Sequence, residues 1–163
     1  DLDEESIKKV TQRVIELGDK KEIVTTDDLP YIISDVLKHD LVHDKVKVIN
    51  YALNLSQGLR PSATIKLSIN DVEYQQFAVG DGQYDAFVKA VKLIYTDNLK
   101  REFPTLTNYM VNIPPGGRTD ALVQANITWL YKGHTIKTRG LDADQIEAAI
   151  QATVKMLNII ENL

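Results

Sequence analysis

The 163-residue chain contains no cysteine. Disulfide frameworks, thiolate metal sites and cysteine nucleophiles are therefore excluded, and the absence fits a reducing compartment. No apolar run approaches the ~18 residues that a membrane-spanning helix needs, and the chain shows no signal-peptide pattern. We therefore expect a cytoplasmic protein with no membrane partner.

A large charge excess is also lacking, because 19 Lys and Arg oppose 23 Asp and Glu for a net charge of −4. Nucleic acids are bound through basic surfaces, so none is expected as a partner. With 44% hydrophobic residues, a chain of this length buries roughly 70% of its unfolded surface in a globular core. Since the chain starts at Asp1 rather than at methionine, we interpret it as a fragment of a longer protein.

Catalytic motifs are missing as well. No Ser-His-Asp grouping or P-loop is present, and the Gly80-x-Gly82 turn lacks the third glycine of the dinucleotide fingerprint. His39 and His43 could face one ion from a helix, but no carboxylate accompanies them as in H-E-x-x-H, so a helix end or a solvated surface is favoured. We expect no catalytic residue, no metal site and no cofactor in this chain.

Residues 1–43 have helical periodicity. In the first part, apolar residues recur at three- and four-residue spacing and Gly18 can end the helix; these residues are Ile7, Val10, Val14 and Leu17. A second helix is predicted from Thr26, where TTDD supplies capping residues. We expect a small helical hairpin that could hardly fold alone.

From Lys45 the periodicity changes to two, which is typical of strands. VKVINYALNL, TIKLSI and VEYQQFAV predict three antiparallel strands, with Ile49 and Tyr51 on one face of the first. The turn GDGQYDA then leads into a helix whose predicted buried stripe comprises Phe87, Ala90, Val91 and Ile94. After Pro104 the same order returns in LTNYMVNI, ALVQANITWLY, HTIKTR and a long helix.

The two halves also share residues. A shift of 58 positions without gaps aligns seven identical residues in 21, among them Tyr51 with Tyr109 and Ile69 with Ile127. We therefore predict an α+β fold of tandem duplicated β-β-β-α units, over residues 44–103 and 104–163, with pseudo-twofold symmetry and the helical hairpin in front. Such symmetry suits a twofold homodimer.

Three motifs occur in order on this frame: Gly-x-Gly-x-x-Asp-Ala at 80–86, Gly-x-x-Asp-Ala at 117–121, and Gly-x-x-x-Asp before an alanine-rich helix at 140–158. Together they resemble the carboxy-terminal regulatory domain of the 2-isopropylmalate synthase family, which includes citramalate synthases. The resemblance covers residues 61–158 well, and residues 1–43 look like the family's linker subdomain. Many members have Pro-Val where this chain has Gln83-Tyr84.

The resemblance implies an allosteric, non-catalytic feedback-inhibition domain. It would bind a branched-chain amino acid, leucine or isoleucine, at a homodimer interface and inhibit the catalytic barrel of the parent chain. That parent would be a 2-isopropylmalate synthase-type acyltransferase using a divalent metal. The alternative is a dimerisation module without ligand binding, which the altered turn at Gln83 and Tyr84 motivates.

An amino acid effector needs an acceptor for its ammonium, donors for its carboxylate and an apolar pocket. Asp85 can accept, and the first-turn amides near residues 82–86 or 142–146 can donate. Tyr84 could wall the pocket and Gln145 could add a polar contact.

Five positions resemble, in type and spacing, those lining the isoleucine pocket of citramalate-type members. These are Leu106, Tyr109, Ile113, Thr119 and Val123. Strand alternation places Tyr109 and Ile113 on one face, whereas Leu106 fits only if it precedes the strand. The aliphatic members could equally be core residues, and Asp85 could simply stabilise the first turn of its helix.

Overall fold

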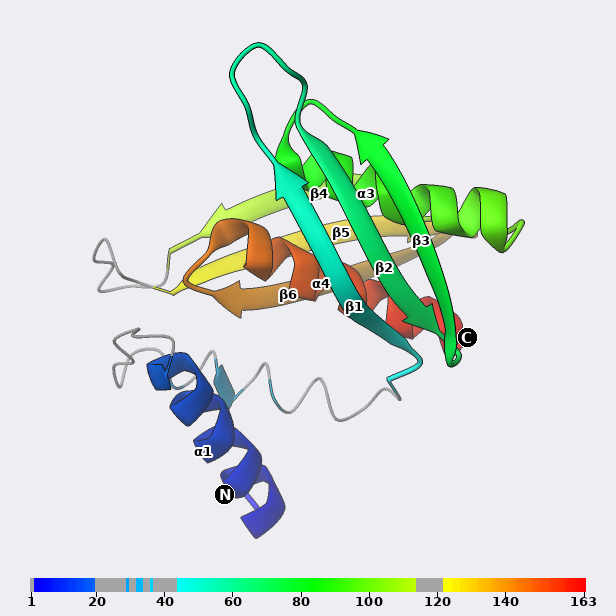
Figure 1. The fold of residues 1–163 in the computed structure, drawn as a ribbon. Helices are drawn as coiled ribbons and strands as arrows, with labels where there is room; N and C mark the ends of the chain where they lie inside the picture. Colours follow the sequence, from blue (N-terminus) through cyan, green and yellow to red (C-terminus); the bar gives the residue numbers. More distant parts are fainter. Residues whose placement is uncertain (1, 20–28, 30–31, 34–35, 37–43, 114–121) are drawn as a thin grey trace.

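The computed structural model describes residues 2–19, 29, 32–33, 36, 44–113 and 122–163 (Figure 1). Along the chain the elements are α1 (Glu4–Asp19), β1 (Val46–Asn54), β2 (Ser62–Ile69), β3 (Val72–Val79), α3 (Gln83–Leu93), the π-helix η1 (Ile94–Asn98), β4 (Thr105–Asn112), β5 (Val123–Tyr131), β6 (His134–Asp142) and α4 (Gln145–Glu161). The predicted tandem β-β-β-α fold is therefore confirmed. Most of the second predicted helix, with Thr26, His39 and His43, lies outside the described residues.

Two three-stranded antiparallel sheets, ordered β1-β2-β3 and β4-β5-β6, enclose the helices α3 and α4. Helix α3 packs on β2 and β3, while α4 packs on β5 and β6 and also reaches β1. The helices touch each other, so both units share one hydrophobic core. The predicted stripe is fully buried there, with its last residue, Ile94, at the start of η1.

The first strand of each unit contains a β-bulge at an equivalent place. The register shifts within Val48–Asn50 of β1 and within Leu106–Asn108 of β4, 58 residues apart. Because a bulge adds one unpaired residue, it reverses the alternation of side chains beyond it. Val48 and Tyr51 therefore both pack against the core, and Ile49 is 47% exposed. The prediction that Ile49 shares a face with Tyr51 was wrong.

Beyond these strands the offset between the units changes. Tyr51 pairs with Ile65 and Tyr109 pairs with Ile127, so the equivalent isoleucines differ by 62 positions (127 − 65 = 62). The first hairpin of unit two is thus four residues longer (62 − 58 = 4). The ungapped match of Ile69 with Ile127 is therefore not a structural equivalence.

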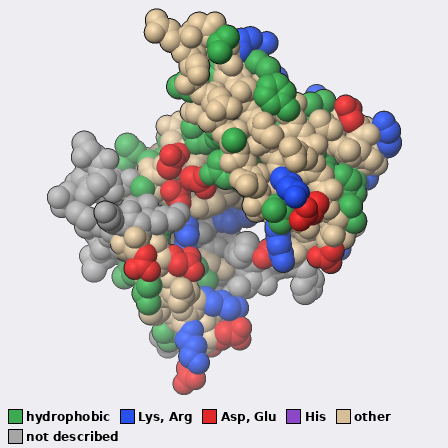
Figure 2. Space-filling view, viewed as in Figure 1, with side chains coloured by type: hydrophobic (Ala, Val, Ile, Leu, Met, Phe, Trp, Pro, Cys, Tyr) green, Lys and Arg blue, Asp and Glu red, His purple; other side chains and the backbone are tan. Residues whose placement is uncertain are grey.

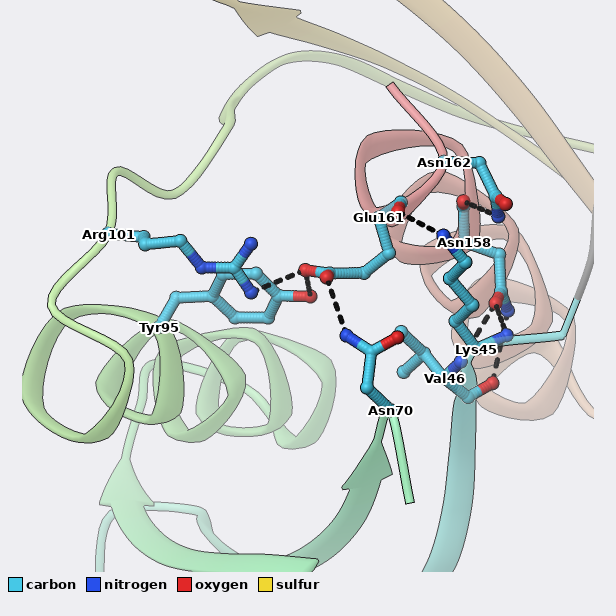
Figure 3. A network of polar contacts seen from close by, with 8 residues as sticks. All are labelled: Lys45, Val46, Asn70, Tyr95, Arg101, Asn158, Glu161 and Asn162. Carbon is cyan, nitrogen blue, oxygen red and sulfur yellow. Dashed lines mark hydrogen bonds and ion pairs between the residues drawn. The ribbon is translucent and has the colours of Figure 1, made fainter. Parts of the chain in front are cut away.

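A buried carboxylate joins the end of α4 to unit one (Figure 3). The side chain of Glu161 is 3% exposed and pairs with the Arg101 guanidinium at 2.7 Å. It also accepts hydrogen bonds from the Tyr95 hydroxyl at 3.0 Å and the Asn70 amide at 3.3 Å. One turn earlier, the Asn158 amide bonds the backbone at the start of β1. These contacts hold the two units together at this end of the core.

Candidate functional site

The N-terminus of α3, in the turn GDGQYDA, has no side-chain cap. Its N-cap residue is Gly82, which makes no side-chain hydrogen bond to the first turn. The N-terminus of α4 is closed instead, because the Asp144 carboxylate accepts from the amides of Ile146 at 2.7 Å and Glu147 at 3.2 Å. Of the two helix ends predicted to receive a carboxylate, α3 is the one whose amides are left open.

The turn brings β3 and α3 into close contact. A Cβ atom on Gly80 would collide with the Ala86 nitrogen and would lie 2.7 Å from a carboxylate oxygen of Asp85. Contacts this short exclude any side chain, so the glycine is needed for the approach of the helix to the strand.

Asp85, the predicted ammonium partner, already has partners within its own turn. Its Oδ2 pairs with the Lys89 ammonium at 2.8 Å and accepts from the Asp81 amide at 2.8 Å. The hydrogen bond from Lys89 is the main cause that lowers the pKa of Asp85, and the Asp81 amide adds to it. The carboxylate is therefore ionised near neutral pH, but an effector ammonium would have to share it with Lys89 or displace Lys89.

Tyr84 links α3 to both neighbouring elements. Its ring stacks on Tyr109 of β4 with centroids 5.4 Å apart and on Phe87 at 6.5 Å. Its hydroxyl lies 2.7 Å from the Thr153 hydroxyl of α4. Because Thr153 donates its own proton to the Ala149 carbonyl, Tyr84 is the donor. Burial raises the pKa of Tyr84 well above its usual value, so the hydroxyl keeps this proton.

Leu106 lies within β4, so the expectation that it fits the wall only by preceding the strand does not hold. The bulge at Thr107 is the physical reason, since the extra residue returns Leu106 to the face that carries Tyr109. Their partners, Trp129 and Ile127, are two residues apart on β5 and both are buried. Leu106 and Tyr109 thus pack against the core from the inner face of the sheet.

The other predicted residues lie toward the far end of the same sheet. Ile113 follows β4 and is 62% exposed, Val123 starts β5 and is half-buried, and Gln145 is the exposed first residue of α4. Four residues of strand, or about 13 Å, separate Tyr109 from Ile113. Thr119 lies outside the described residues.

The structure therefore brings Tyr84 together with Tyr109, and it places Leu106 on the same face of β4 as Tyr109. Sequence reasoning missed Thr153, the hydrogen-bond partner of Tyr84. Its only signal is a β-branched polar residue at a buried position of an otherwise apolar helix face.

A cleft of about 730 Å³ lies between α1, β1 and α4. Figure 2 shows a hollow between the body of sheets and helices and the part of the molecule that contains α1, with Lys and Arg side chains along it. Arg13, Tyr51 and Glu147 are among the lining residues, and none of the predicted effector residues is. The described residues of the predicted effector site therefore lie outside this cleft.

Helix α1 contacts the end of β6. The Arg13 guanidinium donates to the Leu141 carbonyl at 3.0 Å. Leu17 is buried in a small apolar cluster with Leu122 and Leu141. Since neighbouring residues of an extended chain point to opposite faces, Leu122 meets α1 from the face opposite to Val123. The residue before β5 thus packs in the same apolar cluster as α1.

Among the described residues, no group of three His, Asp or Glu side chains is arranged to hold a metal ion. Within the same residues, no helix is long and apolar enough to cross a membrane.

Known proteins are similar to this chain over nearly its whole length. A family model described as "LeuA allosteric (dimerisation) domain" matches residues 23–161. A 2-isopropylmalate synthase of Oceanobacillus iheyensis is 30% identical over 159 residues, which cover 97% of this chain and 30% of that protein. A protein of Archaeoglobus fulgidus provisionally named (R)-citramalate synthase is 32% identical over 158 residues, covering 96% and 31% respectively. This chain therefore spans about a third of the length of these relatives.

Proposed function

Since this chain belongs to the family of LeuA allosteric (dimerisation) domains, we propose that it is the feedback sensor of a 2-isopropylmalate or citramalate synthase. It forms a twofold homodimer in the cytoplasm and binds leucine or isoleucine where the two copies meet. The bound amino acid inhibits a metal-dependent catalytic domain elsewhere in the parent chain. The sensor domain described above contributes no catalytic residue and no cofactor.

The observation that carries the proposal is an open helix N-terminus beside an ionised carboxylate. The uncapped amides at the start of α3 suit the effector carboxylate, and Asp85 suits its ammonium. Tyr84, the residue before Asp85 in the first turn of α3, stacks on Tyr109, and we assign the apolar wall to these two rings. A free amino acid needs these three features in one place.

We place the effector site between two copies because a predicted wall residue is exposed in the single chain. Sites for small molecules bury most of the ligand surface, typically ~70–90%. Ile113, a predicted wall residue, is 62% exposed in the single chain. A second copy over this surface would supply the missing wall, as the twofold character of the fold favours.

Calorimetric titration of the chain with leucine, isoleucine and valine tests the proposal. We expect saturable binding of leucine or isoleucine and weaker binding of valine. Asp85→Ala is expected to abolish binding while the dimer stays folded. Glu73→Ala is the matched control, because Glu73 is also an ion-paired surface carboxylate but lies away from the turn. A folded dimer that binds none of the three amino acids would remove the sensing role.

The second candidate is a dimerisation module that has lost its ligand. The contacts of Asp85 with Lys89 favour it, because they already neutralise the proposed ammonium partner. This reading predicts an unchanged melting temperature at any leucine or isoleucine concentration. The sensing role predicts the opposite, since a ligand at ~100 times its dissociation constant adds ~2.7 kcal/mol of stability.

A further inference from the structure

A second cavity, of about 300 Å³, lies along β5, β6 and the last turns of α4. Two cross-strand pairs contribute to its lining, Asn126 with Arg139 and Thr128 with Lys137. Alternate residues of a strand share a face, so these four side chains stand on the outer face of the sheet. Helix α4 packs on the opposite, inner face, and Lys155 reaches the cavity as a third cation at the free edge of β6, where its ammonium donates to the Arg139 carbonyl at 2.8 Å.

The polar groups that this lining offers are mainly donors. Within the described part of the chain, no hydrogen bond or ion pair occupies the Lys137 ammonium or the Thr128 hydroxyl. The Asn126 side-chain oxygen accepts from the Gln124 amide at 3.3 Å, which leaves its NH₂ group to donate. Arg139 and Lys155 hold other contacts too, so we assign direct recognition to Lys137, Asn126 and Thr128.

The charge at the cavity has the opposite sign to that of the whole chain. Three cationic side chains and one carboxylate, that of Asp44, line it, which gives +2 (3 − 1 = 2), whereas the chain carries −4. Arg139 and Lys155 are half-buried and Lys137 is exposed, and this excess of cations favours an anion over a zwitterion or a neutral molecule.

The duplicated frame shows that this cation pair is not needed for folding. With the offset of 62, the unit-one equivalents of Lys137 and Arg139 are Gln75 and Phe77. The equivalent surface of unit one has a single lysine, Lys66, where unit two has a threonine. The same sheet therefore forms with and without the cations, and only unit two carries them.

We propose that this cavity binds a small dianion, a compact group with two negative charges such as a dicarboxylate or a phosphate. The Lys137 ammonium supplies the main charge contact, and the Asn126 amide and Thr128 hydroxyl donate directional hydrogen bonds. Arg139 and Lys155 add positive potential from either side. The volume matches the lower end of small-molecule sites, ~300–1,000 Å³. The site is separate from the α3 turn and does not depend on amino acid sensing there.

Calorimetry on the chain with inorganic phosphate, succinate and acetate tests the proposal, at about 0.15 M salt so that weak surface attraction is screened. We expect one saturable site per chain for phosphate or succinate, and acetate binding at least about tenfold weaker because it carries one charge. The dianion with the lower dissociation constant shows whether the site prefers a phosphate or a dicarboxylate.

Lys137→Gln is expected to weaken dianion binding by about tenfold or more, as loss of a charge-assisted hydrogen bond does. Lys66→Gln removes the same charge from the equivalent surface of unit one, where the lysine is paired with Glu73 at 2.7 Å, and should leave binding unchanged. Thr128→Val removes a hydroxyl without changing charge and should weaken binding severalfold. Circular dichroism verifies that each variant is folded, which their surface positions favour. Absence of saturable binding by both dianions, or equal weakening in the two lysine variants, would overturn the proposal.

Discussion

Replacing Glu161 with glutamine removes one negative charge from the contact that joins α4 to unit one (Figure 3). The side chain keeps its shape and one amide oxygen, so packing in the core changes little. The Arg101 guanidinium loses its carboxylate partner, and the Tyr95 hydroxyl keeps at best a neutral acceptor. The substitution therefore isolates the electrostatic part of the contact.

The expected loss follows from the burial of the two partners. Removing one member of a fully buried ion pair costs about 3–5 kcal/mol. Here Glu161 is 3% exposed, but Arg101 is 43% exposed, so water can solvate much of the orphaned guanidinium. Hydrogen bonds to a charged group contribute about 1.5–3 kcal/mol. We expect the free energy of unfolding to fall by ~2 kcal/mol.

Urea unfolding followed by circular dichroism measures this loss. With a slope of ~2 kcal/mol/M for a small protein, the midpoint should fall by ~1 M at unchanged slope. Glu73→Gln breaks an exposed ion pair with Lys66 and should change stability by less than ~0.5 kcal/mol. Equal, small effects of the two substitutions would refute the reasoning that burial makes Glu161 important.

Three other substitutions test the turn and its contacts. Asp85→Asn should make stability less sensitive to acid. The pKa of Asp85 in the folded chain lies below 3.8, so its stabilising contribution is complete above pH 3.8 and is lost as the pH falls through the folded pKa. Acid unfolding of the unchanged chain and of the variant measures the difference. Gly82→Asp adds an N-cap side chain in open space, so thermal melts should show the free energy of unfolding rising by about a few tenths of a kcal/mol. The new carboxylate would occupy the amides proposed for the effector, so calorimetry should show weaker effector binding. Tyr84→Phe removes the hydrogen bond to Thr153 and should cost about 1 kcal/mol in urea unfolding, and an unchanged midpoint would contradict the bond.

Much of the fold could be predicted from the sequence because its signals are local. Alternating apolar residues predict the strands, and the spacing of Phe87, Ala90, Val91 and Ile94 predicts the buried face of α3 and of the start of η1. The repeat adds a long-range signal, since two similar halves imply two similar units. The bulges could not be predicted, because nothing in the residue types at Ile49 or Thr107 distinguishes a bulge from regular pairing. The longer hairpin of unit two likewise became visible only through the pairing of Tyr109 with Ile127.

The sequence predicted which residues form the candidate site, but not which side chains contact one another. The sequence indicated that Tyr84 and Asp85 follow a glycine turn, and it indicated an apolar wall on β4. It did not indicate that Asp85 pairs with Lys89, although a four-residue spacing on a helix makes such a pair common. The bond from Tyr84 to Thr153 joins residues 69 positions apart, and no local pattern reports a contact across that separation.

The different caps of the two helices show how the halves of a duplicated domain can divide their tasks. Asp144 completes the start of α4 with its own carboxylate, so that helix end is finished within the chain. Gly82 leaves the start of α3 incomplete, and the missing oxygen must come from water or from another molecule. After a duplication, one copy can keep the side chain that caps its helix, while the other copy leaves its helix amides available to a ligand. In this chain unit two caps its helix with its own side chain, and unit one leaves its helix amides to an outside partner.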